Sequence, residues 1–578
     1  MPVLKDCFKG YTWDLDKALP PEETVQRVLE AFNSTGRDIL AGVERIDTQR
    51  LGIPVFVSLC GPEARKYLPG RKQMGKGSST TQARASALME LVERYSFFTF
   101  WQDPKRWNRA TWTESGKRHG QPLIPIERIL QSVQDDLTPK QAVEVMDLVR
   151  WRFAPVENLS SGTVEHAPMD WFKTLNEFNG SSAGNTAEES ILQGACELIE
   201  RHVSALVDRE CPALPTIDPA SFSDPVLIDL VACFRRTNIR LLLKDFSLGM
   251  PAPTVAALAW DPATFPDHSE IVFTAGTAAS PEKAAIRAVT EVAQLGGDFE
   301  TGSNYEASGL RKFRSLEECA WLQSGDVVPV DSLPDIAHDN MRREIEALCK
   351  GLSVRGFTLY AADISHPELT IPAHFSFVPG FLFRERTAHA SLGLFVGRRL
   401  SEESPPAEAL AGLDTLDRHY PDNHFCDFFR GMVSLRQEDL DTAECLFAAA
   451  EGKQPSAEDR ALAAFYRAYA LTRREHWAAA LPHLDRAIEL SPDHHSYLNL
   501  RGAALYRQQR YAAAARDFQA ALEQDRGSAM DLANLGLCYQ ALGKHRVALD
   551  HLENALKLDP DLEFARFRVE ELRGLLSS

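Results

Sequence analysis

The sequence predicts a mixed α/β domain over residues 1–400, followed by an all-α domain of stacked helical repeats over residues 401–578. Two observations predict this order. In the first part, apolar runs of strand length alternate with capped amphipathic helices, which is typical of α/β folds. In the second part, beyond the proline-containing junction SEESPPAEAL, strand signals stop and a helical pattern repeats every 34 residues.

Composition narrows the class of protein. The chain has 578 residues, 44% of them hydrophobic, which suffices for at least two buried cores. A formal net charge of −18 argues against nucleic acid as the main partner, because phosphate backbones are bound by basic patches. The ten cysteines form no C-x-x-C pair, so neither a zinc site nor a disulfide framework is indicated. A charged N-terminus and the lack of long apolar runs predict a cytoplasmic protein without a membrane span.

The first elements follow from local signals. The Pro-Pro-Glu-Glu start at residues 20–23 predicts a helix whose apolar face holds Val25, Val28, Leu29 and Phe32. Residues 51–60 alternate and are β-branched, which predicts a strand. Short segments between residues 107 and 175 are expected to be strands and connections. The apolar runs 239–247, 253–260 and 270–278 are bounded by Gly, Pro or Asp and predict further strands.

Three helices with one pattern organise the first domain. Ser79 with Gln82, and Thr186 with Glu189, have the spacing of capping boxes, and Ser280 followed by Pro281 starts a third helix. In each helix a glutamate lies eleven residues after the N-cap; these are Glu90, Glu197 and Glu291. A loop rich in Gly and small residues precedes each helix, so backbone N–H groups can face an anion there.

The glutamates predict a shared cation. Glu90 and Glu93 stand at i and i+3, as do Glu197 and Glu200, so each pair lies on one helix face and repels unless a cation lies between. A single E-x-x-E-R is ordinarily a solvated, salt-bridged surface. Here two copies are offset by 107 residues (197 minus 90) and a third helix keeps the spacing, which favours one site for Mg²⁺ and phosphate. Arg94, Arg201 and Arg287 are expected to face phosphate oxygens.

These segments resemble the three ATP-binding motifs of the YcaO family, and the resemblance covers roughly residues 1–400. The similar stretches are ALMELVERYS, the run from Asn185 through Glu189 and Gln193 into CELIER, and AAIRAVTEVAQ. The resemblance implies that Mg²⁺ is held by Glu90, Glu93, Glu197, Glu200 and Glu291. It implies that ATP is bound by Asn185, Glu189, Gln193, Arg201, Arg287 and Gln294.

Lysines are candidates for further phosphate contacts. The resemblance implies one N-terminal lysine, for which Lys5, Lys9 and Lys17 are alternatives and Lys9 is chosen. Lys76 in the loop before the first capped helix is a second candidate, with a solvent-exposed lysine as the alternative. His202 and His268 lack a second ligand at metal spacing and are expected to be structural. No residue is assigned as a covalent nucleophile, so the catalytic residues stay unknown.

The second domain resembles tetratricopeptide repeats (TPR). Small residues keep a spacing of 34 at Ala468, Gly502 and Gly536, and three repeats are clear from about 459 to 561. Gly431 and Ala443 suggest a degenerate fourth repeat before them. Solenoid grooves bind peptides or proteins, so the expected partner is a protein or peptide client, and stacked helices also make a homodimer the expected assembly.

The resemblance also implies an activity. With ATP and Mg²⁺, the protein is expected to phosphorylate, and so activate, a backbone amide or similar carbonyl in a protein or peptide client. The chain ends in RGLLSS rather than a proline-rich tail, which counts against an azoline-forming cyclodehydratase. The architecture is similar to stand-alone YcaO proteins that act as accessory factors for methylthiolation of a ribosomal protein. The alternative is a nucleotide-regulated TPR adaptor that recruits a separate modifying enzyme.

Overall fold

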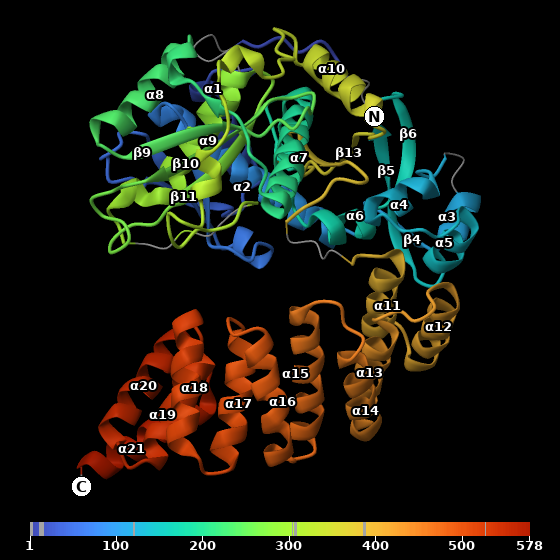
Figure 1. Cartoon of the computed structure of the whole chain (residues 1–578), viewed down its shortest axis with the longest axis vertical. Helices are drawn as coiled ribbons and strands as arrows, with labels where there is room; N and C mark the ends of the chain where they lie inside the picture. The colour runs from blue at the N-terminus through green and yellow to red at the C-terminus, as the bar shows by residue number, and fades with distance from the viewer. Residues whose placement is uncertain are drawn as a thin grey trace. The chain divides into compact units, whose positions relative to one another are not determined.

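A computed structural model describes residues 4–10, 17–118, 122–302, 305, 309–384, 389–525 and 527–577 (Figure 1). The chain forms two compact units. The first contains Met1–Asp136 and Arg150–Ala388, and the second contains Leu137–Val149 and His389–Ser578. Helix α5 (Pro139–Met146) therefore belongs to the second unit, where it packs on α11 (Leu392–Glu403) and α12 (Pro406–His419), although its sequence interrupts the first unit.

The smallest sheet of the first unit has three antiparallel strands, β1 (Leu40–Arg45), β2 (Val55–Cys60) and β3 (Lys72–Lys76). Helix α2 (Thr80–Gln102) packs on β2 and β3, and α1 (Pro21–Ser34) packs on α2. The predicted apolar face of α1 is confirmed, because Val25, Val28 and Phe32 are buried there and Leu29 packs partly buried against the same core.

The second sheet has the order β11-β10-β9-β8-β12. Its strands are β8 (Thr216–Ile217), β9 (Arg240–Asp245), β10 (Thr254–Trp260), β11 (Val272–Thr277) and β12 (Val327–Val328). Alternate residues of β10 enter different cores, as a strand requires. Ala256 and Leu258 pack with residues of α7 (Ala187–Glu210), whereas Ala257 and Ala259 pack with residues of α8 (Pro225–Arg236) and α9 (Pro281–Gly296). The sheet is thus covered on both faces.

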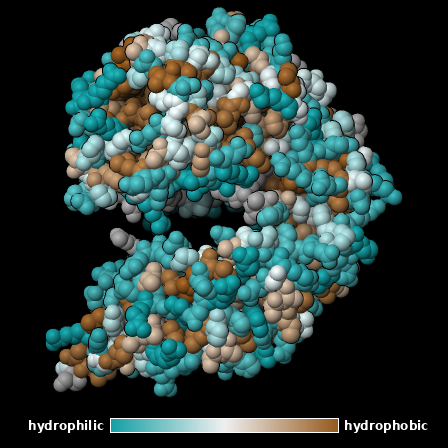
Figure 2. Space-filling view, viewed as in Figure 1, coloured by the Kyte–Doolittle hydropathy of each residue, from teal (hydrophilic) through white to brown (hydrophobic). Residues whose placement is uncertain are grey.

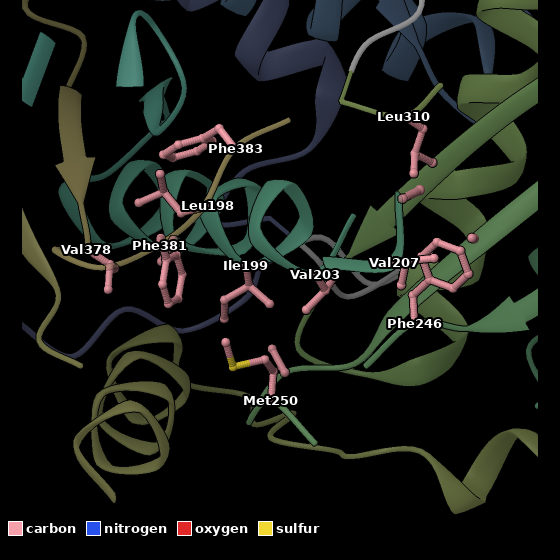
Figure 3. Packing of buried hydrophobic residues seen from close by; sticks show 14 of the residues in the cluster. Leu198, Ile199, Val203, Val207, Phe246, Met250, Leu310, Val378, Phe381 and Phe383 are labelled. Carbon is pink, nitrogen blue, oxygen red and sulfur yellow. The ribbon is translucent and has the colours of Figure 1, made fainter. Parts of the chain in front are cut away.

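Helix α7 runs through the centre of the first unit. Its side chains Leu198, Ile199 and Val203 lie among Met250, Phe246 and the aromatic pair Phe381 and Phe383, as Figure 3 shows. Helix α10 (Met341–Val354) packs against α7 as well. Because α7 is fixed by this core on its apolar side, the polar residues on its remaining surface hold a defined position.

The third sheet has the order β4-β5-β13-β14-β7, with β6 paired to β5. Its strands are β4 (Asn108–Ala110), β5 (Trp151–Asn158), β6 (Thr163–Pro168), β7 (Ser181–Ala183), β13 (Tyr360–Asp363) and β14 (Ala373–Phe377). The expectation of strands between residues 107 and 175 is only partly right. Helices α3 (Trp112–Arg118), α4 (Ile126–Val133), α5 and α6 (Met169–Asn176) also lie there, because their short apolar runs pack on one helical face.

The second unit continues with paired helices. They are α13 (Cys426–Arg436), α14 (Leu440–Glu451), α15 (Ala457–Arg473), α16 (Trp477–Leu490), α17 (His495–Arg507), α18 (Tyr511–Gln524), α19 (Ala529–Ala541), α20 (His545–Leu558) and the final α21 (Glu563–Ser577). A Cβ added to Gly502 would lie 3.0 Å from Phe518, and one added to Gly431 would lie 2.7 Å from Phe447. The same close approach in α13 and α14 supports the predicted fourth repeat.

The surface of both units is mixed in polarity. Figure 2 shows hydrophilic side chains over most of the visible face of each unit, with hydrophobic side chains in separate patches. Among the described residues, no helix is both long enough and apolar enough to cross a bilayer.

Candidate active site

Three strand–loop–helix units carry the predicted site. In β3–α2, β7–α7 and β11–α9 the N-cap lies three positions after the last strand residue; the N-caps are Ser79, Thr186 and Ser280. Each N-cap hydroxyl accepts a hydrogen bond from the backbone N–H three residues further on, at 3.3, 3.1 and 3.4 Å respectively. The predicted helix starts are therefore confirmed, and the three strands are joined to their helices by connections of the same length and with the same N-cap hydrogen bond.

A capping box also needs a second hydrogen bond, from the N-cap backbone N–H to the side chain three residues further on. This part of the two predicted capping boxes is wrong. The Gln82 side chain accepts from the Ser78 backbone N–H at 3.0 Å instead of from its own N-cap. The Glu189 carboxylate accepts from the Ala18 backbone N–H at 3.0 Å, from a distant part of the chain. Spacing alone identifies the N-cap. The side chain three positions further on, however, accepts hydrogen bonds from other backbone N–H groups that the fold brings close to it.

Backbone and hydroxyl donors position the glutamates of α2 and α7. The Ser181 hydroxyl donates to Glu93 at 3.0 Å, and the Gly180 N–H donates to Glu197 at 3.2 Å. At the end of β11, the Thr277 N–H donates to Glu200 at 3.2 Å. These donors come from the ends of β7 and β11, and sequence patterns did not identify the Gly180 and Thr277 donors because a backbone N–H leaves no residue signature.

Two arginines lie against the glutamate pairs. The Arg94 guanidinium is 3.8 Å from Glu90 and 3.6 Å from Glu93. The Arg201 guanidinium is 3.8 Å from Glu197 and 3.9 Å from Glu200. The two E-x-x-E-R copies thus form the same local arrangement, in which one cation partly neutralises two carboxylates of its own helix.

The third helix joins the group through ion pairs and hydrogen bonds. Lys76 at the end of β3 forms an ion pair with Glu291 on α9. Arg287, one turn earlier on α9, donates a hydrogen bond to Gln193 on α7. Gln294, one turn later on α9, is half-buried. Residues from all three capped helices are therefore brought together, as their common spacing predicts.

Burial makes the charge of these carboxylates costly. It raises the pKa of Glu93 to about 8, with Glu197 and Glu90 adding to the rise and Arg94 opposing it. It raises the pKa of Glu200 to about 7, with a further contribution from Glu291. Desolvation likewise raises the pKa of Glu90. Carboxylates whose charged form is disfavoured in this way gain from a divalent cation, which stabilises that form.

The remaining predicted ATP residues lie at the start of α7. Asn185 and Glu189 are 4% and 5% exposed, and the Asn185 amide donates to Glu189 at 3.2 Å and to Thr24 at 3.0 Å. Arg27 of α1 donates to the Asn185 carbonyl at 2.7 Å. Thr24 and Arg27 were not identified from the sequence, where they look like ordinary helix residues.

The chosen N-terminal lysine pairs with a carboxylate that is not among the five predicted Mg²⁺ ligands. The Lys9 ammonium is 2.5 Å from Glu344 on α10, whose side chain is fully buried. Its backbone N–H donates to the Asp339 carbonyl. Contact of Lys9 with phosphate stays a prediction, as do the ATP and Mg²⁺ roles of the other residues.

The donor set fits Mg²⁺ bound together with a nucleotide. Within the described part of the chain, no group of three or more His, Cys, Asp or Glu side chains is placed to hold a metal ion by itself. Mg²⁺ commonly takes one or two carboxylates and completes its shell with phosphate oxygens and water, so separate glutamate pairs suit it. The half-buried cations Lys76, Arg94 and Arg201 beside these pairs suit phosphate.

Comparison with known proteins decides the family. The model for the family described as YcaO cyclodehydratase, ATP- and Mg²⁺-binding, matches residues 74–382. The chain belongs to the YcaO family. Two tetratricopeptide-repeat models match residues 465–529 and 529–562, so the second unit holds TPR repeats. The predicted fold class and the predicted cofactors, ATP and Mg²⁺, are thereby confirmed.

Individual relatives give less detail. An uncharacterised protein of Methanothermobacter thermautotrophicus is 26% identical over 63% of this chain and 94% of its own length. The Escherichia coli ribosomal protein S12 methylthiotransferase accessory factor YcaO is 26% identical, over 33% of this chain and 35% of its length. A solved heterocyclase in complex with substrate and cofactor shares the fold, with a TM-score of 0.53 and 22% identity over 68% of this chain and 57% of its own.

Proposed function

We propose that this YcaO protein uses ATP and Mg²⁺ to activate a peptide-backbone amide or a similar carbonyl of a protein or peptide client. The observation that carries the proposal is the convergence of three identically capped helices, with their five acidic residues, on one place. When bound, ATP supplies the phosphoryl group that makes the carbonyl carbon electrophilic. The chain then has to hold phosphate charge and orient the client.

Different residues would bind Mg²⁺ and the nucleotide. Mg²⁺ would be held by Glu90 and Glu93 of α2 and by Glu197 and Glu200 of α7, because each pair lies half-buried on one helix face, and by Glu291 of α9. The nucleotide would be bound by polar and cationic side chains of β3, α7 and α9 and of the loop before α7: Lys76, Asn185, Glu189, Gln193, Arg201, Arg287 and Gln294. Charge that develops on the transferred phosphoryl group is stabilised by fixed cations and N–H groups in a site shielded from water, and arginine forks suit this role.

The TPR unit would supply the client. Its stacked helices present a surface suited to peptides and proteins, and the same surface would also support a homodimer. Similarity to the E. coli accessory factor favours a client on a post-translational modification route. The second candidate function is a nucleotide-regulated adaptor, which the TPR repeats alone would also support.

The test separates catalysis from recruitment. A client is captured on the full-length chain, and ADP formation is measured with and without it, for the wild type and for Glu200→Gln. The enzyme proposal expects client-stimulated ADP formation that Glu200→Gln abolishes. ATP-dependent client binding without client-stimulated turnover would support the adaptor and overturn the enzyme.

A further inference from the structure

The turn between α6 and β7 has a fixed and unusual backbone. Glu177 ends α6 with φ 53°, and Gly180 has φ 84°. A Cβ on Gly180 would lie 2.3 Å from the Ser376 carbonyl oxygen and 2.9 Å from Leu198 on α7. Only glycine fits this position, so the turn is held tightly against α7 and β14.

This turn touches the glutamate site three times. The Phe178 ring lies under the Arg94 guanidinium, whose central carbon is 4.1 Å from the ring centroid. The Gly180 N–H donates to Glu197, and the Ser181 hydroxyl donates to Glu93. Three residues of the short segment 178–181 therefore contact charged groups of α2 or α7.

The Arg94 guanidinium lies at ion-pair distance from its two glutamates without a hydrogen bond to either. Its distances of 3.8 Å to Glu90 and 3.6 Å to Glu93 are too long for hydrogen bonds. One of its terminal nitrogens, Nη1, is buried and has no hydrogen-bond partner among the described residues. A guanidinium held only by long ion pairs can shift, whereas a ring face 4.1 Å away defines a plane for it.

The equivalent arginine on α7 is held differently. A Cβ added to Gly309 would lie 2.2 Å from a terminal nitrogen of Arg201, so backbone of a neighbouring loop approaches that guanidinium directly. Phe178 contacts the arginine of the α2 copy of the repeated motif. Phe178 is 39% exposed.

We propose that Phe178 is a positioning residue, whose ring fixes the Arg94 guanidinium between Glu90 and Glu93 and so sets the geometry in which these carboxylates meet Mg²⁺ and ATP. This inference rests on the proposed function of the same site. It assigns to the α6–β7 turn the task of aligning the first and second glutamate pairs. Phe178 touches neither nucleotide nor client in this role.

The test compares Phe178→Leu with Phe178→Tyr in the full-length chain. Leucine fills the space without an aromatic face, whereas tyrosine keeps the face. Calorimetry measures the affinity for ATP at saturating Mg²⁺ and the Mg²⁺ concentration needed at fixed ATP. We expect Phe178→Leu to weaken ATP binding by about fivefold to thirtyfold and Phe178→Tyr to stay within about twofold of the wild type.

A matched control exists in the second unit. Phe567, 63% exposed, has the Arg568 guanidinium 5.7 Å from its ring centroid, so Phe567→Leu removes the same kind of contact far along the chain. It should leave ATP affinity unchanged. The melting temperature of the ligand-free chain is measured for all variants, because a merely structural role would lower it for Phe178→Leu without a selective loss of ATP affinity.

The outcomes are distinct. Wild-type affinity in Phe178→Leu overturns the inference, as does equal loss in Phe178→Leu and Phe178→Tyr. Phe178→Met, which also fills the space without an aromatic face, should give a loss like that of Phe178→Leu and keeps the test decisive where Phe178→Leu does not fold. If Phe178→Leu binds ATP more weakly than Phe178→Tyr but the wild type does not activate a client, the proposed function is refuted and the role of Phe178 is not. Absence of Mg²⁺–ATP binding in the wild type would overturn both.

Discussion

Replacing Glu93 with glutamine should stabilise the ligand-free protein while removing its response to Mg²⁺ and ATP. The Glu93 side chain is 17% exposed, and burial raises its pKa from 4.5 to about 8. Between these values the folded chain binds more protons than the unfolded chain, so the free energy of unfolding falls as the pH rises. Glutamine resembles the protonated form and does not carry this cost.

The expected magnitude follows from the shift. At about pH 7 the folded chain keeps Glu93 largely protonated while the unfolded chain ionises it, so folding costs about 3 kcal/mol more than with a permanently neutral side chain, from roughly 2.5 pH units above the unfolded pKa at 1.36 kcal/mol each. Glu93→Gln should therefore be more stable than the wild type at about pH 7 and above. The difference should shrink toward about pH 5, because Glu93 then becomes protonated in the unfolded chain as well.

The assay is urea unfolding of the full-length chain in EDTA across this pH range. Because the chain has two compact units, the relevant transition is the one that Mg²⁺ and ATP shift in the wild type. Glu30→Gln, at an exposed position of α1, is the control and should show no pH-dependent gain. A Glu93→Gln variant that is less stable at every pH would refute the reasoning and make Glu93 a structural partner of Arg94.

Three further predictions concern the same site and its neighbour unit. Glu90→Gln should abolish client-stimulated ATP turnover with cooperative unfolding retained, as circular dichroism would show; loss of cooperativity would mean a structural role. Arg287→Lys should lower kcat/KM for ATP by about tenfold or more, because a point charge cannot replace the planar fork that meets Gln193, and steady-state kinetics unchanged from the wild type would contradict this. Deleting residues 405–578 should leave Mg²⁺–ATP binding in place but end action on the client. That truncation also removes α12, on which α5 packs, so light scattering and unfolding must first show a folded chain, and full-rate action on the client would disprove the recruiting role.

The sequence predicted the site through recurrence. One capped helix with an E-x-x-E-R face is explained by a solvated, salt-bridged surface. Three helices whose N-caps all lie at the same distance from a glutamate are not explained by solvent exposure alone. The structure adds a second equality, because β3, β7 and β11 each lead into their helix through a connection of the same length. The TPR register could be predicted for a similar reason, since close helix packing requires a small residue at one position of every repeat.

What the sequence could not show depends on tertiary contacts. The donors from Gly180 and Thr277 are backbone groups, and the Phe178 contact joins residues 84 positions apart (178 minus 94). Short apolar runs between residues 107 and 175 suit strands and helices equally, so their type is decided by what they pack on. The placement of α5 in the second unit is likewise set by its neighbours and not by its own pattern.

The central claim is that the glutamates of α2, α7 and α9 bind ATP only through Mg²⁺. Calorimetric titration of ATP into the full-length chain, once with Mg²⁺ and once in EDTA, tests it most directly. We predict saturable binding with Mg²⁺ and an affinity weaker by about a hundredfold or more in EDTA, because the buried carboxylates then repel the phosphates. Equal affinity in the two titrations would contradict it.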